Sequence, residues 1–297
     1  MKKIVCFGET LWDLLPTGKI EGGAPMNVAV HAKQLGLSVS MISRVGKDKL
    51  GDGLECFLVD RGIDTSALQR DNFYQTGVVQ VSLSEKGSPT YSIESPAAWD
   101  AIEADETTKQ LVKNAEAFVF GSLACRNEKS KNALFELAAL ASLRVLDVNL
   151  RTPFFSQELI IDLLEMADFV KVNEEELALI CSWFNQNEDD ELNARYLKTR
   201  FNLRAIVVTR GGDGAFFIGE NNSLYEHKGY QVSVKDTIGS GDSFLASFLK
   251  KWLYASSPDD CLSYACAVGA FVATQQGATP IIDESDIKAV MQPNLEA

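Results

Sequence analysis

The sequence predicts an α/β protein whose mostly parallel central sheet is covered by helices on both faces. Short apolar segments typical of buried strands alternate with segments of helical period along most of the 297 residues, and this alternation is typical of parallel strands joined by crossover helices. Polar residues directly follow several of these strands, at the edge where ligands bind in such sheets. Glycine-rich turns at the starts of two predicted helices complete the pattern.

The N-terminal part begins with a buried strand at residues 3–7, which ends at Gly8. A turn at residues 22–25 precedes a helix at 26–35, and a strand at 39–45 and a short helix at 52–61 follow. Asp13 stands before the glycine-rich turn that carries Asn27, and this polar pair is suited to hold hydroxyl groups. The alternative is that they are solvated loop residues.

Residues 75–94 depart from the alternation of helices and strands. Two strands at 76–83 and 90–93, joined by a turn at 85–89, form a hairpin. A hairpin inserted in an α/β chain has no core of its own, so we expect it to cover part of the protein as a lid. Pairing with another chain as a subunit contact is the alternative.

From residue 105 the alternation resumes and gives three sets of polar residues at one predicted edge. These sets are Asn149 with Arg151, Asn173 with Glu176, and the turn at 209–214. Because the carboxyl ends of parallel strands meet at one edge of a sheet, we expect the three sets to lie close together. The predicted elements are helix 105–113, strand 118–120, helix 128–142, strand 144–148, helix 156–166, strand 169–172, helices 174–184 and 189–201, strand 205–208 and helices 259–276 and 284–291.

The composition excludes several classes of protein. The net charge of −13 argues against nucleic acid or an anionic membrane as the main partner, since both select basic surfaces. No apolar run is long enough to span a membrane and the N-terminus does not look like an export signal, so we expect a cytoplasmic protein. The cysteines form no C-x-x-C pair, which argues against a zinc site, and we expect them to be reduced and mostly buried. They are Cys6, Cys56, Cys125, Cys181, Cys261 and Cys266.

Residues 235–243 carry the strongest functional signal. Gly239 and Gly241 flank Ser240 and would destabilise a helix interior, whereas apolar residues recur at helical spacing from 244 to 253. The helix therefore starts at the glycines, where free N–H groups and the helix dipole suit a phosphate. Asp242, in the first turn, is either a helix cap or a chemical base.

The sequence has neither G-x-x-x-x-G-K-[ST] nor a G-x-G-x-x-G after the first strand, which disfavours P-loop and dinucleotide-dependent enzymes. What remains is a helix start for a phosphate, an aspartate beside it, and a glycine-rich turn after Thr209 that lets a nucleotide lie close to the backbone. Phosphoryl transfer uses these parts, because dipoles balance the charge on the transferred group and a carboxylate takes the proton of the attacking hydroxyl.

Four segments carry a resemblance to a known family: G-G-A-P-M-N-V-A at 22–29, N-E-E-E at 173–176, T-R-G-G-D-G at 209–214 and D-T-I-G-S-G-D at 236–242. With these in order, the sequence resembles the ribokinase/PfkB family of carbohydrate kinases over essentially its whole length. Gly8-Glu9 with Asp13, and segments 96–100 and 147–151, look most like the bacterial fructokinases of that family. The resemblance implies a ribokinase-like three-layer α/β/α fold in a single domain over 1–297. Inserted segments 12–22 and 74–98 would form a small β lid, and the alternative role of these strands is the contact of a homodimer.

By position, the resemblance implies that Asp242 is the catalytic base and that the N–H groups of Gly239, Ser240 and Gly241 form an anion hole for the transferring phosphate. The residues expected to hold sugar hydroxyls are Asp13, Gly23 and Asn27. Arg151 would approach the phosphate or the sugar, and a structural ion pair is the alternative. Asn173 and Glu176 would organise Mg²⁺ through water. The residues expected to bind ATP are Lys171, Asn173, Thr209, Gly211, Gly212 and Gly214.

Many members of the family also bind K⁺ beside the anion hole. By position the ligands here would be Asp236, Ile238, Val272, Gln275 and Gly277. Ile281 stands where ribokinases often have a serine as a further cation ligand, so K⁺ dependence is an open question. Cys266 stands where an Asn often meets the adenine, which leaves the adenine contacts open.

The sequence therefore predicts an ATP-dependent sugar kinase that phosphorylates a primary hydroxyl of a hexose, with fructose to fructose 6-phosphate as the first choice. Alternative acceptors within the family are ribose, 2-keto-3-deoxygluconate and a nucleoside. The alternative from another class is a catalytically silent sugar-binding regulatory protein on the same fold.

Overall fold

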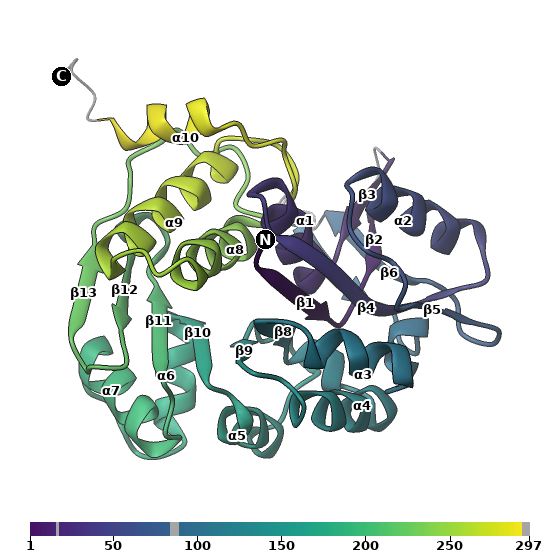
Figure 1. Ribbon diagram of the computed structural model, residues 1–297, viewed down its shortest axis with the longest axis horizontal. Coiled ribbons are helices and arrows are strands. Elements are labelled where there is room, and N and C mark those ends of the chain that lie inside the picture. The colour runs from purple at the N-terminus through teal and green to yellow at the C-terminus, as the bar shows by residue number, and fades with distance from the viewer. Residues whose placement is uncertain (16–17, 84–88, 293–297) are drawn as a thin grey trace.

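The main sheet of the computed structural model runs through the centre of the molecule (Figure 1). The model describes residues 1–15, 18–83 and 89–292, and within them nine strands form this sheet in the order β13-β12-β11-β10-β9-β8-β1-β4-β5. All neighbouring pairs are parallel except those that β12 makes with β11 and β13. The strands are β1 (Lys3–Phe7), β4 (Ser38–Gly46), β5 (Leu68–Asp71), β8 (Ala117–Gly121), β9 (Arg144–Asp147), β10 (Phe169–Asn173), β11 (Ala205–Thr209), β12 (Ala215–Ile218) and β13 (Leu224–His227).

Helices cover both faces of the main sheet. Side chains alternate across each strand, so Ile4 and Cys6 of β1 pack with α1, α2, α8 and α9, while Val5 and Phe7 pack with α3 to α7. No helix in the described ranges is long and apolar enough to cross a membrane. The helices are α1 (Ala24–Gln34), α2 (Lys49–Asp60), α3 (Glu106–Lys113), α4 (Glu128–Ala138), α5 (Gln157–Met166), α6 (Glu174–Ser182), α7 (Asp190–Arg200), α8 (Ser240–Leu253), α9 (Pro258–Ala273) and α10 (Glu284–Met291), with short 3₁₀ helices η1 (Ala98–Ala101), η2 (Leu123–Cys125) and η3 (Gly211–Asp213).

The predicted layered fold with a mostly parallel sheet is confirmed, and several boundaries are corrected. The predicted helix at 128–142 ends at Ala138, because Leu140 and Ala141 bond back to carbonyls three residues earlier and tighten the last turn. The helix predicted at 52–61 starts at Lys49, because the Asp48 side chain caps it by accepting from the Gly51 N–H. β5, β12 and β13 were not predicted. Each has only four residues, too few to show a period.

A second, smaller sheet has the strand order β3-β2-β6-β7 and lies beside α2 (Figure 1). Its strands are β2 (Leu11–Leu15), β3 (Gly18–Gly22), β6 (Gly77–Leu83) and β7 (Pro89–Ile93), which fall in the segments expected to form a lid. The β2–β3 and β6–β7 pairs are antiparallel, and β2 and β6 are parallel neighbours. Most of the predicted turn at 85–89 lies outside the described residues.

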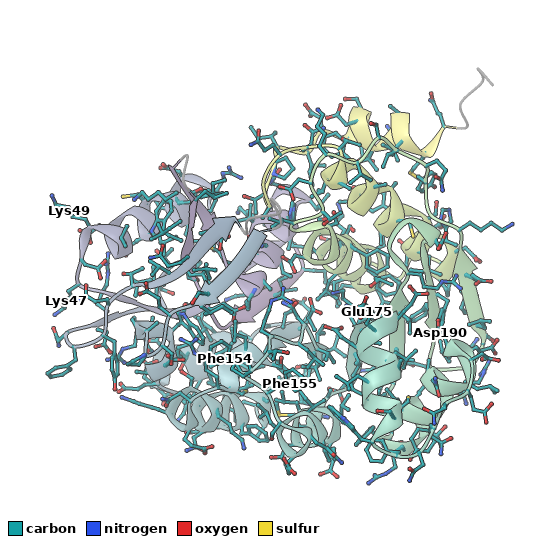
Figure 2. The ribbon with its side chains drawn as sticks, turned by 180° about the vertical axis from the view of Figure 1, so that it is seen from behind. Lys47, Lys49, Phe154, Phe155, Glu175 and Asp190 are labelled. Atoms are coloured by element: carbon teal, nitrogen blue, oxygen red, sulfur yellow. The ribbon has the colours of Figure 1, made fainter. Side chains whose placement is uncertain are left out.

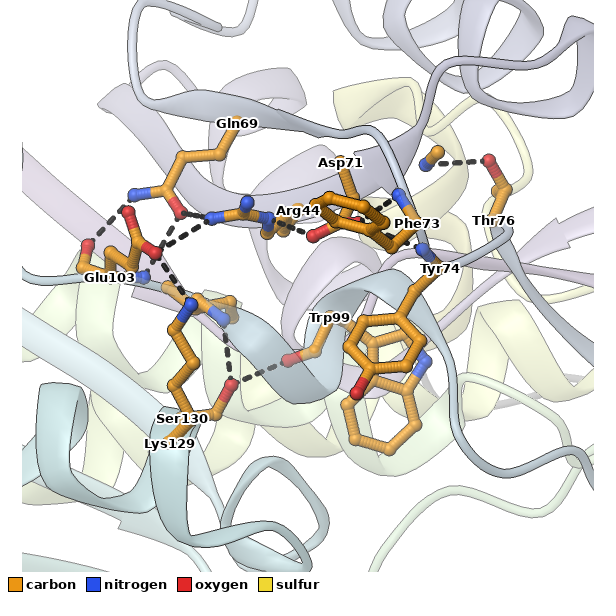
Figure 3. A network of polar contacts seen from close by, with 12 residues as sticks. Arg44, Gln69, Asp71, Phe73, Tyr74, Thr76, Trp99, Glu103, Lys129 and Ser130 are labelled. Carbon is orange, nitrogen blue, oxygen red and sulfur yellow. Dashed lines mark hydrogen bonds and ion pairs between the residues drawn. The ribbon is translucent and has the colours of Figure 1, made fainter.

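Polar contacts join the edge strand β5 to the elements around it (Figure 3). Arg44 of β4 donates to Asp71 at 2.6 Å, and the other oxygen of Asp71 accepts from the Phe73 and Tyr74 N–H groups. On the helical side, Ser130 of α4 donates to the Trp99 carbonyl at 2.7 Å. The Ser130 bond holds η1, through which the chain returns from the small sheet to the main one.

The cysteines agree with the prediction that they are reduced and mostly buried. All six are free thiols, and five of them are buried. Cys56, on α2, is the exposed one.

Candidate active site

The glycine turn forms the start of α8, as the sequence predicts. Gly239 is the N-cap residue and has a φ of 78° in the left-handed region, which glycine adopts without strain. A Cβ atom there would also collide with the carbonyl oxygen of Ala278. Ser240 donates its N–H to the Thr237 carbonyl at 3.2 Å, so this N–H already has a partner within the turn. Asp242 is the third residue of the helix and not its cap.

Asp242 is hydrogen-bonded to a side chain from a distant part of the sequence. Asn27, on α1, donates from its side-chain nitrogen to Oδ2 of Asp242 at 2.8 Å. Burial raises the pKa of Asp242 to about 6, and the charge of Asp147 adds to this, while Lys171, the Asn27 hydrogen bond and Arg151 oppose it. A carboxylate with such a pKa is able to exchange a proton near neutral pH.

A buried ion pair lies behind the glycine turn. Lys171 of β10 and Asp147 of β9 are opposite each other in the sheet, and Nζ lies 2.8 Å from Oδ1. Burial opposes the charge on Lys171, but the charges of Asp147 and Glu176 outweigh it and raise the pKa of the ammonium. A Cβ atom placed on Gly241 would lie 3.2 Å from Lys171 Nζ, so the ammonium sits directly against the start of α8. Oδ2 of Asp147 is buried and, among residues 1–15, 18–83 and 89–292, has no hydrogen-bond partner.

Asn173 and Glu176 form a capping box at the start of α6. The Asn173 side chain accepts from the Glu176 N–H at 2.8 Å, and Oε2 of Glu176 accepts from the Asn173 N–H at 3.0 Å. Oε1 of Glu176 accepts from the Leu150 N–H at 2.9 Å, which ties the segment after β9 to α6. Burial raises the pKa of Glu176, with the charge of Lys171 opposing it. Both carboxylate oxygens therefore have backbone partners.

The residues expected to bind the nucleotide line one cleft of about 320 Å³. Asn173 and Thr209 are neighbours at the ends of β10 and β11, which confirms that these two sets share an edge of the sheet. Open space lies above Gly211 and Gly212, where added Cβ atoms would meet nothing within 4 Å. Lys171 does not line the cleft. The lining residues that the sequence predicted for the nucleotide or the anion hole are Asn173, Thr209, Gly211, Gly212, Gly214, Ser240 and Gly241. Cys266, whose position left the adenine contacts open, also lines the cleft.

The remaining walls of this cleft are largely apolar and were not predicted. They come from Phe244 of α8, from α9 and from the segment between β13 and α8, whose sequence has neither helical nor strand period and therefore gave no signal. The hydroxyl of Tyr230 is 2.9 Å from the Ser263 Oγ. The additional lining residues are Gly229, Tyr230, Val232, Val234, Thr237, Phe244, Gly269, Ala270 and Ala273.

The expected sugar-binding residues come from three different elements. Asp13 lies in β2, and burial raises its pKa to about 6 against the opposing charge of Arg151. Gly23 is the N-cap of α1, where a Cβ atom would collide with the Glu9 carbonyl. Arg151 is exposed, and within the described ranges it has no ion-pair partner within 4 Å. Its guanidinium donates to its neighbour's carbonyl, Leu150 O, at 3.1 Å.

The two sides of Asp13's strand have different surroundings. Trp12 faces α2, where its Nε1 donates to the Leu50 carbonyl at 3.0 Å and its ring packs against Gly53. Asp13 faces the other way, as alternation along a strand requires, and lines a small cavity of about 80 Å³ that also touches Asp236. Asp13 is therefore a strand residue on the inner face of the small sheet and not part of a solvated loop.

Two acidic residues of the site were not among the predicted ones. Asp147 is described above, and Glu9, just after β1, is 3% exposed, with no partner for its Oε2 in the part of the chain that the structure describes. Burial raises the pKa of Glu9 to about 7, Arg151 lowers it and Asp242 raises it. Both residues stand at or just beyond the carboxyl end of a strand, so the edge rule that selected Asn173 would also have found them.

Arg126 connects the small sheet to the segment after β9. Its guanidinium donates to both carboxylate oxygens of Asp100, at 2.7 and 2.8 Å, and to the Glu94 carbonyl at 2.7 Å. The same group lies 4.9 Å from the ring of Phe154, which follows Arg151 in the chain and is labelled in Figure 2. A buried cation thus holds together the two segments that border the expected sugar site.

The expected cation loop brings its two halves together. The Gly277 N–H donates to Oδ2 of Asp236 at 3.1 Å, and Oδ1 of Asp236 accepts from the Ile238 N–H. The Val272 carbonyl accepts from the Gln275 N–H at 2.9 Å at the end of α9. Over the described part of the chain, no group of three or more His, Cys, Asp or Glu side chains is placed to hold a metal.

Comparisons with known proteins agree with this geometry. The model of the pfkB family of carbohydrate kinases matches residues 1–285. The chain is 29% identical to the protein named "Probable fructokinase-6, chloroplastic" and 30% identical to "Probable fructokinase-7", both of Arabidopsis thaliana, over 97% and 95% of this chain and 83% and 90% of those proteins. A crystal structure of Vibrio cholerae fructokinase with fructose, ADP and calcium superposes with a TM-score of 0.85 at 25% identity, covering 98% of this chain and 99% of that one. The chain therefore belongs to the pfkB family and is an ATP-dependent carbohydrate kinase that resembles fructokinases.

Proposed function

We propose that this kinase is a fructokinase that transfers the γ-phosphate of ATP to the 6-hydroxyl of fructose, with Asp242 as the general base. One observation carries the mechanism: a carboxylate with a pKa near 6 lies in the first turn of a helix whose start is open to the nucleotide cleft. Support for fructose as the acceptor comes from the names of the most similar relatives and from the fructose-bound Vibrio cholerae structure.

In the proposed reaction the 6-hydroxyl gives its proton to Asp242 while its oxygen attacks the γ-phosphorus, and the bond to the β-phosphate oxygen breaks to release ADP. The N–H groups of Gly239 and Gly241 and the positive end of the α8 dipole face the charge on the transferred group, while the Ser240 N–H is bonded to the Thr237 carbonyl. Lys171 adds a positive charge behind the same turn. Asp13, Gly23, Asn27 and Arg151 hold the sugar, with the small sheet acting as a lid that excludes water.

The polar residues near the phosphate end fit a magnesium ion held through water. Both oxygens of Glu176 accept backbone N–H groups, so this carboxylate keeps its orientation and offers its remaining lone pairs to a water molecule. The buried, unpaired Oδ2 of Asp147 offers a further acceptor. Bound Mg²⁺ would neutralise the triphosphate.

A potassium ion fits the donor chemistry of the loop formed by Asp236, Ile238, Val272, Gln275 and Gly277, because carboxylate and carbonyl oxygens suit a hard cation. Ile281 is 77% exposed and has no oxygen on its side chain, so its side chain adds no ligand. We propose that K⁺ raises activity without being essential.

The experiment that tests the proposal is a panel of acceptors assayed for ADP release with ATP and Mg²⁺, with and without K⁺. The panel contains fructose, glucose, ribose, 2-keto-3-deoxygluconate and a nucleoside. The proposal requires fructose to have the highest kcat/KM, with the phosphate on the 6-position. A higher kcat/KM for any other acceptor would replace fructose, and the absence of turnover on all of them would favour a regulatory protein. The cytoplasmic location and a homodimer through the small sheet stay predictions.

A further inference from the structure

One face of α1 carries three polar side chains that point toward α8 and the loop after α9. Asn27, His31 and Gln34 are spaced four and three residues apart, so they lie on the same side of the helix. Asn27 donates to Asp242. Gln34 donates to the Pro280 carbonyl at 3.1 Å and accepts from the Ile282 N–H at 2.9 Å. His31 lies between them.

His31 is completely buried and makes one hydrogen bond to the described residues. Its Nε2 lies 2.8 Å from the carbonyl oxygen of Ala278. Burial lowers the pKa of His31 to about 4, with the Ala278 hydrogen bond opposing the shift, so the ring is neutral at pH 7. A carbonyl oxygen is only an acceptor, and therefore the proton of the neutral ring is on Nε2 and is donated to Ala278.

Ala278 is the residue against which the glycine turn rests. A Cβ atom on Gly239 would collide with the carbonyl oxygen, the Cα atom and the carbonyl carbon of Ala278. The oxygen that accepts from His31 is therefore the same atom that limits the position of Gly239. His31 holds this oxygen by a hydrogen bond, and Gly239 packs against the same oxygen. A shift of the Ala278 carbonyl would therefore shift the glycine turn as well.

We propose that His31 is a positioning residue for phosphoryl transfer. It holds Ala278 against Gly239 and so keeps the backbone N–H groups of the Gly239–Gly241 turn at a fixed distance from the carboxylate of Asp242. This inference rests on the proposed role of the Gly239–Gly241 turn as the anion hole. Helix α1 then positions both the base and the anion hole. Asn27 bonds the base, Asp242, and His31, one turn further along, supports the anion hole through Ala278. A fixed distance between the base and the transferred phosphate is what an in-line transfer requires.

The test compares two substitutions of His31 with one substitution of Gln34. His31→Leu keeps an apolar side chain in the core but leaves the Ala278 oxygen without its donor. His31→Gln keeps an amide N–H at the same number of bonds from Cβ. Gln34→Leu is the control, because it removes two hydrogen bonds to the same loop at Pro280 and Ile282 without touching Ala278. For each variant we measure kcat, the KM for sugar and for ATP, and the midpoint of thermal unfolding.

We expect His31→Leu to lower kcat about 10- to 100-fold, the range for a small displacement of catalytic groups, with the KM for sugar changed less than about threefold. His31→Gln should recover most of kcat, and Gln34→Leu should lower the unfolding midpoint with kcat retained. The inference is overturned if His31→Leu keeps the wild-type kcat, or if His31→Leu and Gln34→Leu lose kcat in proportion to their loss of stability. A wild-type protein that does not turn over any sugar would instead refute the proposed function. If the wild type is active but Asp242→Asn keeps its turnover, the assignment of the base and its anion hole fails, whatever His31 does.

Should His31→Leu not fold, the His31→Gln variant still decides the question. Its ring is gone but its donor remains, so near-normal kcat supports hydrogen bonding to Ala278 as the role of this residue. A folded His31→Gln protein with kcat as low as that of Asp242→Asn would show that the imidazole itself, and not the donated hydrogen bond, is needed, and would overturn the proposal.

Discussion

The two ends of the candidate site differ in the groups that form them: the phosphate end at the start of α8, and the sugar end around Asp13 and Arg151. At the phosphate end the chain uses backbone N–H groups at the start of α8, glycines without side chains, and a buried ion pair between Lys171 and Asp147. At the sugar end it uses side chains from separate elements, Asp13 from the small sheet and the exposed Arg151 from the segment after β9. Only Asn27 belongs to both, because it contacts Asp242 from the helix that follows Gly23.

Because of this difference, we expect the phosphate end to determine the transfer chemistry and the sugar end to determine the acceptor. The phosphate end is held by the main sheet, whose strands are buried on both faces, and it supplies the chemistry that every acceptor shares. In the proposed function the sugar end depends on how the small sheet lies over the main one, so we expect the choice of acceptor to be set there. Substitutions at the phosphate end should therefore lower kcat, and those at the sugar end should raise the KM for sugar. The predictions below test this division, from the largest expected effect to the smallest.

Asp242→Asn should lower kcat by about 10²–10⁴, the range for the loss of a general base, with little change in the KM for sugar. Steady-state kinetics with saturating ATP measures both quantities. Asp260→Asn is the matched control, because Asp260 occupies the same third position in α9 that Asp242 occupies in α8. If both variants lose turnover equally, Asp242 acts on the helix and not on the reacting hydroxyl. If neither does, Asp242 is not the general base.

Lys171→Met should lower the free energy of unfolding by about 3–5 kcal/mol, because it leaves Asp147 as an unpaired buried charge. It should also lower kcat/KM for ATP. Chemical denaturation and kinetics give the two values.

The double variant Lys171→Met with Asp147→Leu separates stability from function. Replacing a buried ion pair with apolar residues is often neutral for stability, so the double variant should recover much of the unfolding free energy but none of the activity. Recovery of both would mean that the pair is structural and that the phosphate end does not use its charge.

Asp13→Asn should raise the KM for sugar by roughly 10- to 100-fold, which corresponds to the loss of a hydrogen bond to a charged group, and leave kcat within about threefold. The control is Glu21→Gln in β3. Glu21 pairs with Trp12 and therefore lies on the opposite face of the small sheet, where the KM should not change. An Asp13→Asn effect on kcat alone would contradict the division between the two ends.

The pH dependence of kcat/KM for sugar should have an acid limb near pH 6, because kcat/KM reports the free enzyme and Asp242 acts as a base only when it is ionised. With a pKa of about 6, roughly a tenth of Asp242 is ionised at pH 5, so kcat/KM at pH 5 should be about a tenth of its plateau. Asn27→Leu removes a hydrogen bond that lowers this pKa, and it should move the limb to higher pH. A limb that stays in place, or moves to lower pH, would assign it to another group.

Much of the main sheet and of the phosphate end could be predicted because their signals are local. Gly239 and Gly241, on either side of Ser240, mark the start of α8. The polar residues after β9, β10 and β11 were expected near the ligand because ligands bind at the carboxyl ends of parallel strands. The antiparallel strand β12 was not predicted, because its four residues directly follow a glycine turn and are too few to show a period.

The contacts between distant segments could not be predicted from one sequence. Nothing near Asn27 indicates that its side chain meets Asp242, 215 residues later, and the sequence of Glu9 does not reveal that it is buried. The same holds for His31, which reads as an ordinary helix residue until α1 packs against α8. Local patterns identify the parts of the site, whereas the packing of α1 and the small sheet decides which parts meet.

The exposure of Cys56 gives this protein a ready position for a reporter group. Cys56 lies on α2, three residues after the Gly53 that packs against Trp12 of the small sheet, while the other five cysteines are buried. A thiol-reactive fluorophore would therefore label the native enzyme at one site, with no need to remove cysteines first. Its emission would follow the surroundings of the small sheet as sugar is added, so movement of that sheet becomes measurable in solution without any substitution in the site.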